Sequence, residues 1–374
     1  MIRFLTAGES HGKKLIGILE GIPANLKFDE NYINNELRRR QIGYGRSERM
    51  KMENDKIIVL SGVSNGRTTG NPISIEIKNA GYRRELTEIK RPRPGHGDLS
   101  GSLKYNQYDI RNILERASAR ETAMRVAIGS ICKMLLDNFN VSIHSHVIQI
   151  GKIQTNFTIY EGATIEDIKL SDNSQVRVIE NEVEKEIINR IEKAILEGDT
   201  LGGAFELVAT NVPVGLGSHI SWDKRLDGKI AQSIMSIPGI KGVEIGRGFQ
   251  SGSLYGSELQ DEIYYENSKY VRKTNNAGGI EGGISNGENI VVRAVMKPIP
   301  TLKKPLKSID MDTKKVSLAH VERSDVCAVP SASVVGESML AYILANEFQN
   351  KFGGDSIEEV MKNYSEYLKY VSSR

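Results

Sequence analysis

The chain has 374 residues, of which 39% are hydrophobic and 26% are charged, and its formal net charge at pH 7 is +3. These proportions are typical of a soluble globular protein with one large domain or two. No stretch approaches the roughly 18 apolar residues of a membrane span, and the mild charge does not suggest nucleic-acid binding. The two cysteines, Cys132 and Cys327, stand in unrelated contexts, which predicts neither a metal site nor a disulfide. Because no leader peptide is expected either, the sequence predicts a protein of the reducing cytoplasm.

The first third of the chain predicts short strands, one helix and one long loop. The expected strands cover residues 2–5, 13–21, 56–61 and 73–78, and the expected helix covers residues 29–40. Residues 79–105 have a proline-rich centre and predict a long loop. In a compact protein a loop of this length is usually functional or disordered.

The clearest helix signal begins at Ser118. Residues 118–121 read Ser-Ala-Arg-Glu, which is a capping box, and apolar residues follow at helical spacing as far as Leu135. A helix N-terminus presents free backbone N–H groups, so a phosphate is one expected ligand there, beside Arg116. An ordinary helix cap explains the same residues equally well.

The rest of the chain predicts strands interspersed with helices. The expected strands cover residues 141–150, 204–211, 241–246, 289–296 and 316–321, the expected helices cover residues 180–197, 227–237 and 334–348, and residues 355–374 predict a polar helix or a partly disordered tail. Because the strands occur in runs without a regular βαβ alternation, the pattern predicts an α+β fold with antiparallel sheets. No G-x-G-x-x-G motif follows a strand, so a dinucleotide site of the Rossmann type is not expected.

Glycine is enriched and gathers in short patches. The chain has 36 glycines, with patches at residues 42–46, 95–101, 278–287 and 352–354. Such patches let the backbone adopt positive φ and approach a ligand closely. We therefore expect a site assembled from several loops.

Residues 8–12 read Gly-Glu-Ser-His-Gly, which matches the G-x-S-x-G nucleophile elbow of hydrolases. An elbow needs a strand that runs into a helix, whereas strands are expected on both sides of this motif. A glycine-rich hairpin loop is the favoured interpretation. A serine hydrolase that uses Ser10 is an alternative, which a fluorophosphonate probe would test.

Basic residues stand beside glycine and proline turns, in the segments 38–40, 46–49, 91–93 and 297–304 and at Arg116 and Arg323. Arginine forks suit carboxylates and phosphates, so converging loops would form a cationic pocket for a substrate with several negative charges. Solvated surface arginines are the ordinary alternative.

Two of the six histidines, His11 and His96, lie in glycine-flanked loops beside these cationic segments. Imidazole titrates near neutral pH, which makes both residues candidates for proton transfer. The alternative for each is a solvent-exposed loop histidine without a chemical role.

An ordered series of motifs resembles the chorismate synthase family. The motifs are Gly-Glu-Ser-His-Gly at 8–12, Arg-Arg-Gln-Ile-Gly-Tyr-Gly-Arg at 39–46, Arg-Pro-Gly-His-Gly-Asp at 93–98, Glu-Arg-Ala-Ser-Ala-Arg-Glu-Thr at 115–122, Lys-Gly-Val-Glu-Ile-Gly at 241–246, Asn-Ala-Gly-Gly-Ile-Glu-Gly-Gly at 276–283 and Arg-Ser-Asp at 323–325. The resemblance runs over nearly the whole chain.

The resemblance implies the last step of the shikimate pathway. In that step, 1,4-anti elimination of phosphate from 5-enolpyruvylshikimate 3-phosphate gives chorismate. The family requires reduced FMN, although the reaction has no net redox change. NADPH is one reductant for the flavin, and a separate reductase is the other. The substrate carries a phosphate and two carboxylates, which suit the expected cationic loops.

The resemblance also implies roles for individual positions. His11 and His96 resemble the two family histidines, one of which helps to keep the reduced flavin in its protonation state while the other assists the departing phosphate. Asp325 resembles the family aspartate close to the flavin N5. The positions that resemble FMN-binding ones are Arg116, Ala117, Ser118, Pro238, Gly239, Gly282, Lys297, Pro298, Ile299, Pro300, Thr301 and Arg323. The positions that resemble substrate- or NADP-binding ones are Ser10, Arg40, Arg46 and Arg93.

Two of these positions depart from the family pattern. Pro238-Gly239 stands where relatives often have Asn-Ala, which preserves a backbone contact to the flavin but not a side-chain amide contact. Ala117 stands where serine is common, which removes one hydroxyl donor.

The fold implied by the resemblance is a single-domain β-α-β sandwich, with helices packed between antiparallel sheets, that assembles as a homotetramer. We expect one catalytic domain over residues 1–350 and a polar tail over residues 351–374. The non-enzyme alternative is a nucleic-acid-binding protein. Against it, aromatic residues make up only 6% of the chain and do not interleave with the arginines.

Overall fold

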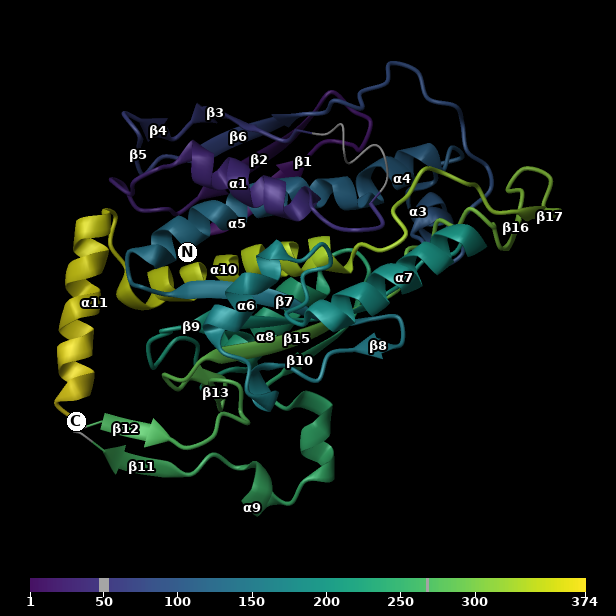
Figure 1. Cartoon of the computed structure of the whole chain (residues 1–374). Coiled ribbons are helices and arrows are strands. Elements are labelled where there is room, and N and C mark those ends of the chain that lie inside the picture. The colour runs from purple at the N-terminus through teal and green to yellow at the C-terminus, as the bar shows by residue number, and fades with distance from the viewer. Residues whose placement is uncertain (47–53, 267–268) are drawn as a thin grey trace.

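The computed structural model of the chain describes residues 1–46, 54–266 and 269–374. Two antiparallel sheets form its framework (Figure 1). The first sheet has the order β1-β2-β6-β3 and consists of β1 (Arg3–Ala7), β2 (Lys14–Glu20), β6 (Ile73–Lys78) and β3 (Ile57–Ser61). The second sheet has the order β10-β15-β9-β7-β8 and consists of β10 (Ile240–Ile245), β15 (Ile290–Met296), β9 (Gly203–Thr210), β7 (Ser142–Ile150) and β8 (Ile153–Gln154).

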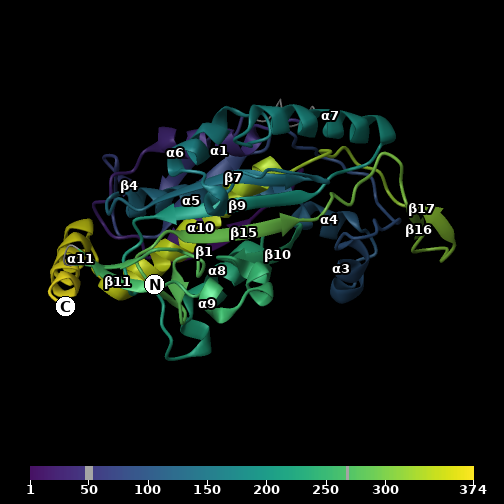
Figure 2. The same ribbon diagram turned by 60° about the horizontal axis from the view of Figure 1, so that its bottom comes forward.

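Helices pack against one another and against both sheets. The central ones are α1 (Glu30–Gln41), α5 (Thr122–Asp137), α8 (Leu226–Met235) and α10 (Val329–Phe352). Helix α5 contacts β1 and β2 of the first sheet, α10 contacts β7 and β9 of the second, and α5 and α10 pack along each other (Figures 1 and 2). The close approach requires Gly129 of α5, because a Cβ there would lie 2.4 Å from the Cβ of Ser338 in α10.

The apolar pattern of the strands explains why the helices pack where they do. Side chains alternate between the two faces of a strand. In β2 the inward residues Leu15 and Leu19 are buried, whereas Ile16 and Ile18 point outward and are exposed. In α5 and α10 nearly every position is buried, as expected for helices enclosed on most sides.

Further helices and strands surround this core. They are β4 (Val63–Ser64), β5 (Arg67–Thr68), α3 (Asp98–Tyr105), α4 (Arg111–Ala117), α6 (Ile165–Leu170), α7 (Asn181–Glu197), α9 (Gly256–Leu259), β11 (Ile263–Glu266), β12 (Lys269–Arg272), β13 (Ile280–Glu281), β14 (Ile284–Ser285), β16 (Lys307–Ile309), β17 (Val316–Leu318) and α11 (Ile357–Ser372). Both ribbon views place α3, α4 and the β16–β17 hairpin at the end of the molecule opposite α11 (Figures 1 and 2).

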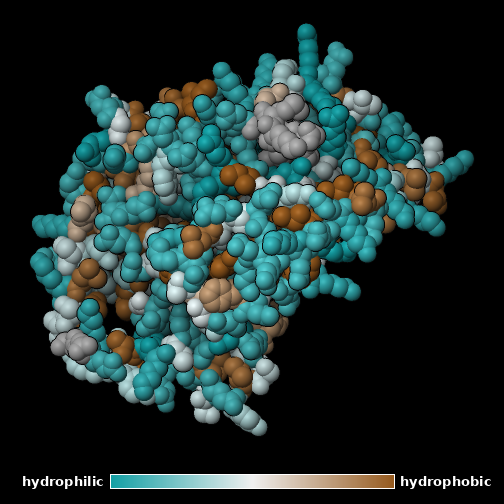
Figure 3. All heavy atoms as spheres, viewed as in Figure 1, coloured by the Kyte–Doolittle hydropathy of each residue, from teal (hydrophilic) through white to brown (hydrophobic). Residues whose placement is uncertain are grey.

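The surface is mostly polar, with apolar residues scattered over the face drawn in Figure 3. Among the described residues, no helix is both long and apolar enough to cross a membrane.

The predicted α+β class is confirmed as a mixture of helices and antiparallel sheets, and most predicted strands and helices lie where expected. Two elements differ clearly from the expectation: the end of the expected loop at 79–105 forms α3, and α10 starts at Val329, ahead of the predicted 334. Of the two alternatives for residues 355–374, the helix is confirmed, because residues 357–372 form α11. Pro330 marks the earlier start of α10, because proline is favoured in the first helical turn.

The capping prediction at Ser118 is only partly correct. The Ser118 side chain accepts a hydrogen bond from the N–H of Arg120 and caps a short 3₁₀ helix, η1 (Ala119–Glu121), rather than α5 itself. Helix α4 ends at Ala117, directly before Ser118. Because the backbone passes directly from one helix into the next, fewer free N–H groups are available at this helix start than the sequence pattern suggested.

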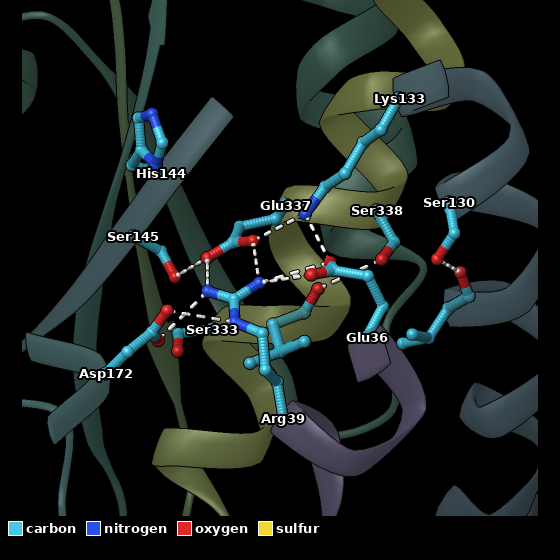
Figure 4. A network of polar contacts seen from close by, with 12 residues as sticks. Glu36, Arg39, Ser130, Lys133, His144, Ser145, Asp172, Ser333, Glu337 and Ser338 are labelled. Atoms are coloured by element: carbon cyan, nitrogen blue, oxygen red, sulfur yellow. Dashed lines mark hydrogen bonds and ion pairs between the residues drawn. The ribbon is translucent and has the colours of Figure 1, made fainter. Parts of the chain in front are cut away.

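A buried ionic cluster joins the central elements (Figure 4). Glu337 of α10 is fully buried. Its carboxylate accepts hydrogen bonds from Arg39 of α1 at 2.8 and 3.0 Å, from Lys133 of α5 at 2.6 Å and from Ser145 of β7 at 2.6 Å. Arg177 donates a further bond at 3.2 Å. One carboxylate thus connects three helices and a strand.

The cluster keeps Glu337 ionised in spite of its burial. Burial alone raises the pKa of a carboxyl group, but the neighbouring cations Arg39, Lys133 and Arg177 hold the pKa of Glu337 well below its usual range. Glu36 shares Arg39 and Lys133 with Glu337, so the cluster pairs several charges of each sign.

Replacing Glu337 with alanine should destabilise the protein strongly. The substitution leaves Arg39, Lys133 and Arg177 near one another without their shared counter-ion, and removing one partner of a buried ion pair typically costs about 3–5 kcal/mol. Urea unfolding followed by circular dichroism measures the loss. The matched control is Glu366→Ala, which removes an exposed i,i+3 pair with Lys369 and should leave the unfolding midpoint nearly unchanged. Equal midpoints for the two variants would contradict the role given to Glu337.

Candidate functional site

The Gly-Glu-Ser-His-Gly motif forms the turn of the β1–β2 hairpin. Gly8 has φ +108°, and a Cβ there would lie 2.4 Å from the carbonyl oxygen of Lys14, so the turn requires glycine. Ser10 is buried, and its N–H donates to the carbonyl of Glu115 at 3.0 Å. Because the motif connects two strands, it lacks the strand–helix geometry of a nucleophile elbow, as the sequence analysis expected.

His11 is held by a carboxylate from another element. Its Nδ1 lies 2.8 Å from Oε1 of Glu115 in α4, and its backbone N–H donates to Oε2 of the same residue at 2.7 Å. Burial raises the pKa of Glu115, but the hydrogen bonds from His11 and the charge of Arg111 lower it overall. An ionised carboxylate only accepts hydrogen bonds, so Nδ1 of His11 carries a proton. His11 is 9% exposed and is therefore no freely solvated loop histidine.

Arg111 connects the His11 pair to a second histidine. Its Nη1 lies 2.7 Å from Oε1 of Glu322 and 3.6 Å from Oε1 of Glu115. The same oxygen of Glu322 lies 3.1 Å from Nε2 of His320. This chain of contacts ties the β1–β2 turn to residues 320–322, which directly precede the Arg-Ser-Asp motif.

His96 is held in a similar way. Its Nδ1 lies 2.6 Å from Oδ1 of Asp98, which is 0% exposed. Arg93 donates hydrogen bonds to the same carboxylate from Nε at 2.8 Å and from Nη2 at 3.0 Å. Burial raises the pKa of Asp98, yet the hydrogen bonds from His96 and Arg93 hold it well below its usual range.

Three of the predicted segments meet at Thr301. Nη1 of Arg93 donates to the Thr301 hydroxyl at 2.7 Å, and the Ser324 hydroxyl donates to the Thr301 carbonyl at 3.0 Å. The ammonium of Lys297 donates to the carbonyl of Gly95. The histidine loop, residues 297–301 and the Arg-Ser-Asp motif therefore form one cluster, as predicted.

Asp325 pairs with Arg46, with an Nη1–Oδ2 distance of 3.2 Å and both side chains largely buried. The Arg323 side chain, two residues before Asp325, is exposed, whereas Arg46 comes from a distant segment and forms an ion pair with this aspartate. The pairing brings a predicted substrate-binding arginine directly to the predicted catalytic aspartate.

Arg40 lies in a second buried ion-pair group. Its Nη2 is 3.2 Å from Oδ2 of Asp55, and Arg120 binds the same carboxylate at 2.6 and 2.7 Å. Burial raises the pKa of Asp55, but the two arginines lower it overall. Two cations on one carboxylate leave this group with a net positive charge.

Arg116 lies in the last turn of α4, not at an open helix N-terminus as its sequence context suggested. Its exposed guanidinium donates to the carbonyls of Thr6 and Gly8 at 2.9 and 3.1 Å and to the Thr6 hydroxyl at 2.8 Å. These contacts place a cation beside the β1–β2 turn. The neighbouring Ala117 is exposed, and Ser118 is half-buried in its capping role.

Two FMN-like sites remain: the Pro238-Gly239 pair contacts the cluster, whereas Gly282 does not. The carbonyl of Gly239, which follows Pro238, accepts from the N–H of Lys297 at 2.9 Å. Gly282 lies in the turn between β13 and β14. Gly279, just before β13, packs against Asn289 at the start of β15, whereas Lys297 follows the end of β15. Within one chain, Gly282 is therefore at the opposite end of β15 from residues 297–301.

The arrangement suits a ligand with several negative charges. Arg46, Arg93, Arg116 and Lys297 come from four different segments, with Arg93 and Lys297 at the His96 loop, Arg116 at the β1–β2 turn that carries His11, and Arg46 at Asp325. Burial and the charge of Lys241 lower the pKa of Lys297, as expected for a cation among cations. Among the described residues, no group of three histidine, cysteine, aspartate or glutamate side chains is placed to bind a metal ion.

The sequence analysis missed the carboxylates that position the site. Glu115, Asp98 and Asp55 were not singled out as functional, although the first two stand inside the quoted motifs. The local signal for Asp98 was available, since it lies two residues after His96. Glu115 pairs with a histidine 104 residues away, which no local pattern reveals.

Comparisons with known proteins all point to one family. The model of the chorismate synthase family matches residues 2–348. The chain is 53% identical over 380 residues to the chorismate synthase of Alkaliphilus metalliredigens, covering 98% of this chain and 99% of that protein. It is 54% identical over 377 residues to that of Caldanaerobacter subterraneus, with 100% of both chains covered. It is also similar to a crystal structure of a chorismate synthase, with a TM-score of 0.83 and 45% identity over 100% of this chain and 99% of the other.

Proposed function

Because the chain belongs to the chorismate synthase family, we propose that the loop cluster around His11, His96 and Asp325 is its active site. The chain is a lyase that converts 5-enolpyruvylshikimate 3-phosphate to chorismate with loss of phosphate, the last step of the shikimate pathway. The observation that supports the assignment of the site is that carboxylates hold Arg46, Arg93 and both histidines, with Glu115 and Asp325 coming from distant segments and Asp98 from the His96 loop itself.

The enzyme depends on a flavin, and we propose that the active form is reduced FMN. These segments suit a flavin phosphate, because their cationic side chains and hydroxyl groups can donate hydrogen bonds to it from several parts of the chain. The residues proposed to hold FMN are Arg116, Ala117, Ser118, Pro238, Gly239, Lys297, Pro298, Ile299, Pro300, Thr301 and Arg323. Gly282 would join them either from a neighbouring subunit or after a rearrangement of the chain. When bound, reduced FMN supplies an electron transiently as phosphate leaves. NADPH and a separate reductase are the two alternative sources of reducing equivalents.

We propose that the substrate's phosphate and carboxylates bind to Ser10, Arg40, Arg46 and Arg93. Guanidinium forks match the geometry of both anions. Asp55 and Asp325 hold Arg40 and Arg46 in fixed positions, so little side-chain entropy is lost when the substrate binds.

We assign proton handling to the two histidines and Asp325. Each imidazole has a carboxylate at Nδ1, which leaves Nε2 as the ring nitrogen that exchanges a proton with ligands. One of the two histidines then assists the departing phosphate, and the other stabilises the protonation state of the reduced flavin. Asp325 holds or passes on the proton that leaves C6 of the substrate.

We propose that the whole molecule is a β-α-β sandwich, with one catalytic domain over residues 1–350 and a polar tail over residues 351–374. We also propose that it is a cytoplasmic homotetramer without a nucleic-acid partner. The outer face of the first sheet supports self-association. It exposes Leu5, Ile16, Ile18, Ile58 and Leu60, and contiguous exposed apolar residues are typical of protein interfaces.

Replacing either histidine with alanine should lower turnover by roughly ten- to a thousandfold, a range that overlaps the roughly hundred- to ten-thousandfold contribution typical of general acid–base catalysis. An anaerobic assay with photoreduced FMN and saturating substrate measures it, and a thermal melt checks folding. His219→Ala is the control, because this histidine is exposed and outside the cluster. Wild-type turnover in His11→Ala or His96→Ala would remove that residue from the mechanism.

Asp325→Asn separates a proton carrier from a structural partner of Arg46. The amide keeps the shape of the carboxylate but cannot accept a proton, so a proton carrier loses turnover while the melting temperature is nearly preserved. A purely structural partner in this buried pair instead loses stability, by up to about 3–5 kcal/mol, and keeps its turnover. The anaerobic assay and the thermal melt of this one variant distinguish them. A destabilised variant with normal turnover would exclude Asp325 from the chemistry.

A further inference from the structure

Asn79 is a buried amide that directly follows β6 and lies beside the turn that carries His11. Its backbone N–H donates to the carbonyl of Lys13 at 3.1 Å. Its side-chain Nδ2 donates to the carbonyl of Glu9 at 3.0 Å and to that of Gly12 at 2.9 Å. Three hydrogen bonds from one residue therefore hold the backbone on both sides of His11.

The side-chain oxygen of Asn79 faces a different part of the site. Oδ1 accepts from Nε of Arg120 at 2.9 Å. Nη1 and Nη2 of Arg120 bind the two carboxylate oxygens of Asp55 at 2.6 and 2.7 Å, and Nη2 of Arg40 lies 3.2 Å from the same carboxylate. All four side chains are buried. Asn79 thus connects the His11 turn to Arg40, an arginine proposed to bind the substrate.

These contacts require an amide at position 79. A guanidinium can only donate hydrogen bonds and a backbone carbonyl can only accept them. Oδ1 of Asn79 must therefore face Arg120, and Nδ2 must face the two carbonyls. A carboxylate at this position would offer no donor to the turn, and an alkyl side chain would satisfy neither side.

The residues that follow Asn79 support the same turn. The N–H of Arg83 donates to the carbonyl of His11 at 3.2 Å. Together with the bonds from Asn79, this contact lets residues 79–83 bind the carbonyls of residues 9, 11, 12 and 13. The start of the long segment at 79–105 therefore shapes the histidine turn.

We propose that Asn79 is a positioning residue, which holds the His11 turn in a fixed place relative to the buried arginine group that includes Arg40. This proposal rests on the roles proposed above for His11 and Arg40. The connection presents the imidazole to the bound substrate in one geometry. Misplacing a reacting group by about 1 Å can cost roughly a hundredfold in rate, so Asn79 contributes to kcat by holding the turn.

Asn79→Ala removes all the side-chain bonds of the amide. We expect kcat at saturating substrate to fall by roughly ten- to a hundredfold. A readout separate from activity is hydrogen–deuterium exchange mass spectrometry of the full chain without flavin or substrate. Exchange in residues 8–13 should become faster, because the turn opens more often without its supporting bonds.

The matched control is Asn363→Ala. The Asn363 amide also donates to a backbone carbonyl, that of Phe352 at 2.8 Å, but it lies in α11, at the end of the molecule opposite α4 (Figure 1). This variant should keep both the turnover and the exchange of residues 8–13.

A double-mutant cycle with His11→Ala separates positioning from general damage. If Asn79 acts through His11, Asn79→Ala leaves the kcat of His11→Ala unchanged, because the group that it positions is already absent. A wild-type kcat in Asn79→Ala, an equal fall in both backgrounds or unchanged exchange in residues 8–13 would overturn the proposal. Wild-type turnover in His11→Ala would instead refute the role of His11, and the proposal for Asn79 with it.

Should Asn79→Ala fail to fold, Asn79→Asp serves in the same cycle. The carboxylate keeps an acceptor for Arg120 but has no donor for the carbonyls of Glu9 and Gly12. Because the assay uses saturating substrate, the added charge does not act on kcat through binding. The same fall in kcat and the same faster exchange are expected, and a wild-type value of either would overturn the proposal.

Discussion

The fully buried carboxylate of Glu337 is the interaction on which the arrangement of the core depends (Figure 4). It binds side chains from α1, α5 and β7, so the positions of these elements are fixed relative to α10. The ends of the same elements carry the site. Helix α1 leads to Arg40 and Arg46, and the Ser331 hydroxyl in the first turn of α10 donates to the carbonyl of Arg40 at 2.8 Å. A charge cluster in the core thereby determines where the loops of the site begin.

The site repeats the same physical device on a smaller scale. Each key cation or imidazole is held by a carboxylate, which comes from a distant part of the chain in His11–Glu115 and Arg46–Asp325 and from the same loop in His96–Asp98. Such pairs keep the side chains in place before the ligand arrives, which reduces the cost of ordering them on binding. The carboxylates also limit the repulsion among so many positive charges in one place. The result is a preorganised environment for a substrate with one phosphate and two carboxylates.

Local patterns in the sequence predicted the elements well, because strands such as β7 and helices such as α7 have clear periodicities. They also identified His11 and His96, which stand in recognisable motifs. They did not reveal the partners of these residues. The pairing of Arg39 with Glu337 spans 298 residues and that of His11 with Glu115 spans 104. Such contacts arise only from the three-dimensional packing of the elements. Gly282, which the family resemblance groups with residues 297–301, lies at the opposite end of β15 from them within one chain.

The central claim is that cationic loops held by carboxylates form one shared site for the flavin and the phosphorylated substrate. Titration of oxidised FMN by fluorescence, with and without 5-enolpyruvylshikimate 3-phosphate, tests it directly. Two anions that are neutralised by one set of residues organise that site for each other. We expect FMN to bind at least about fivefold more tightly when the substrate is present, the lower end of typical coupling between sites. Equal affinities in the two titrations would contradict a shared site.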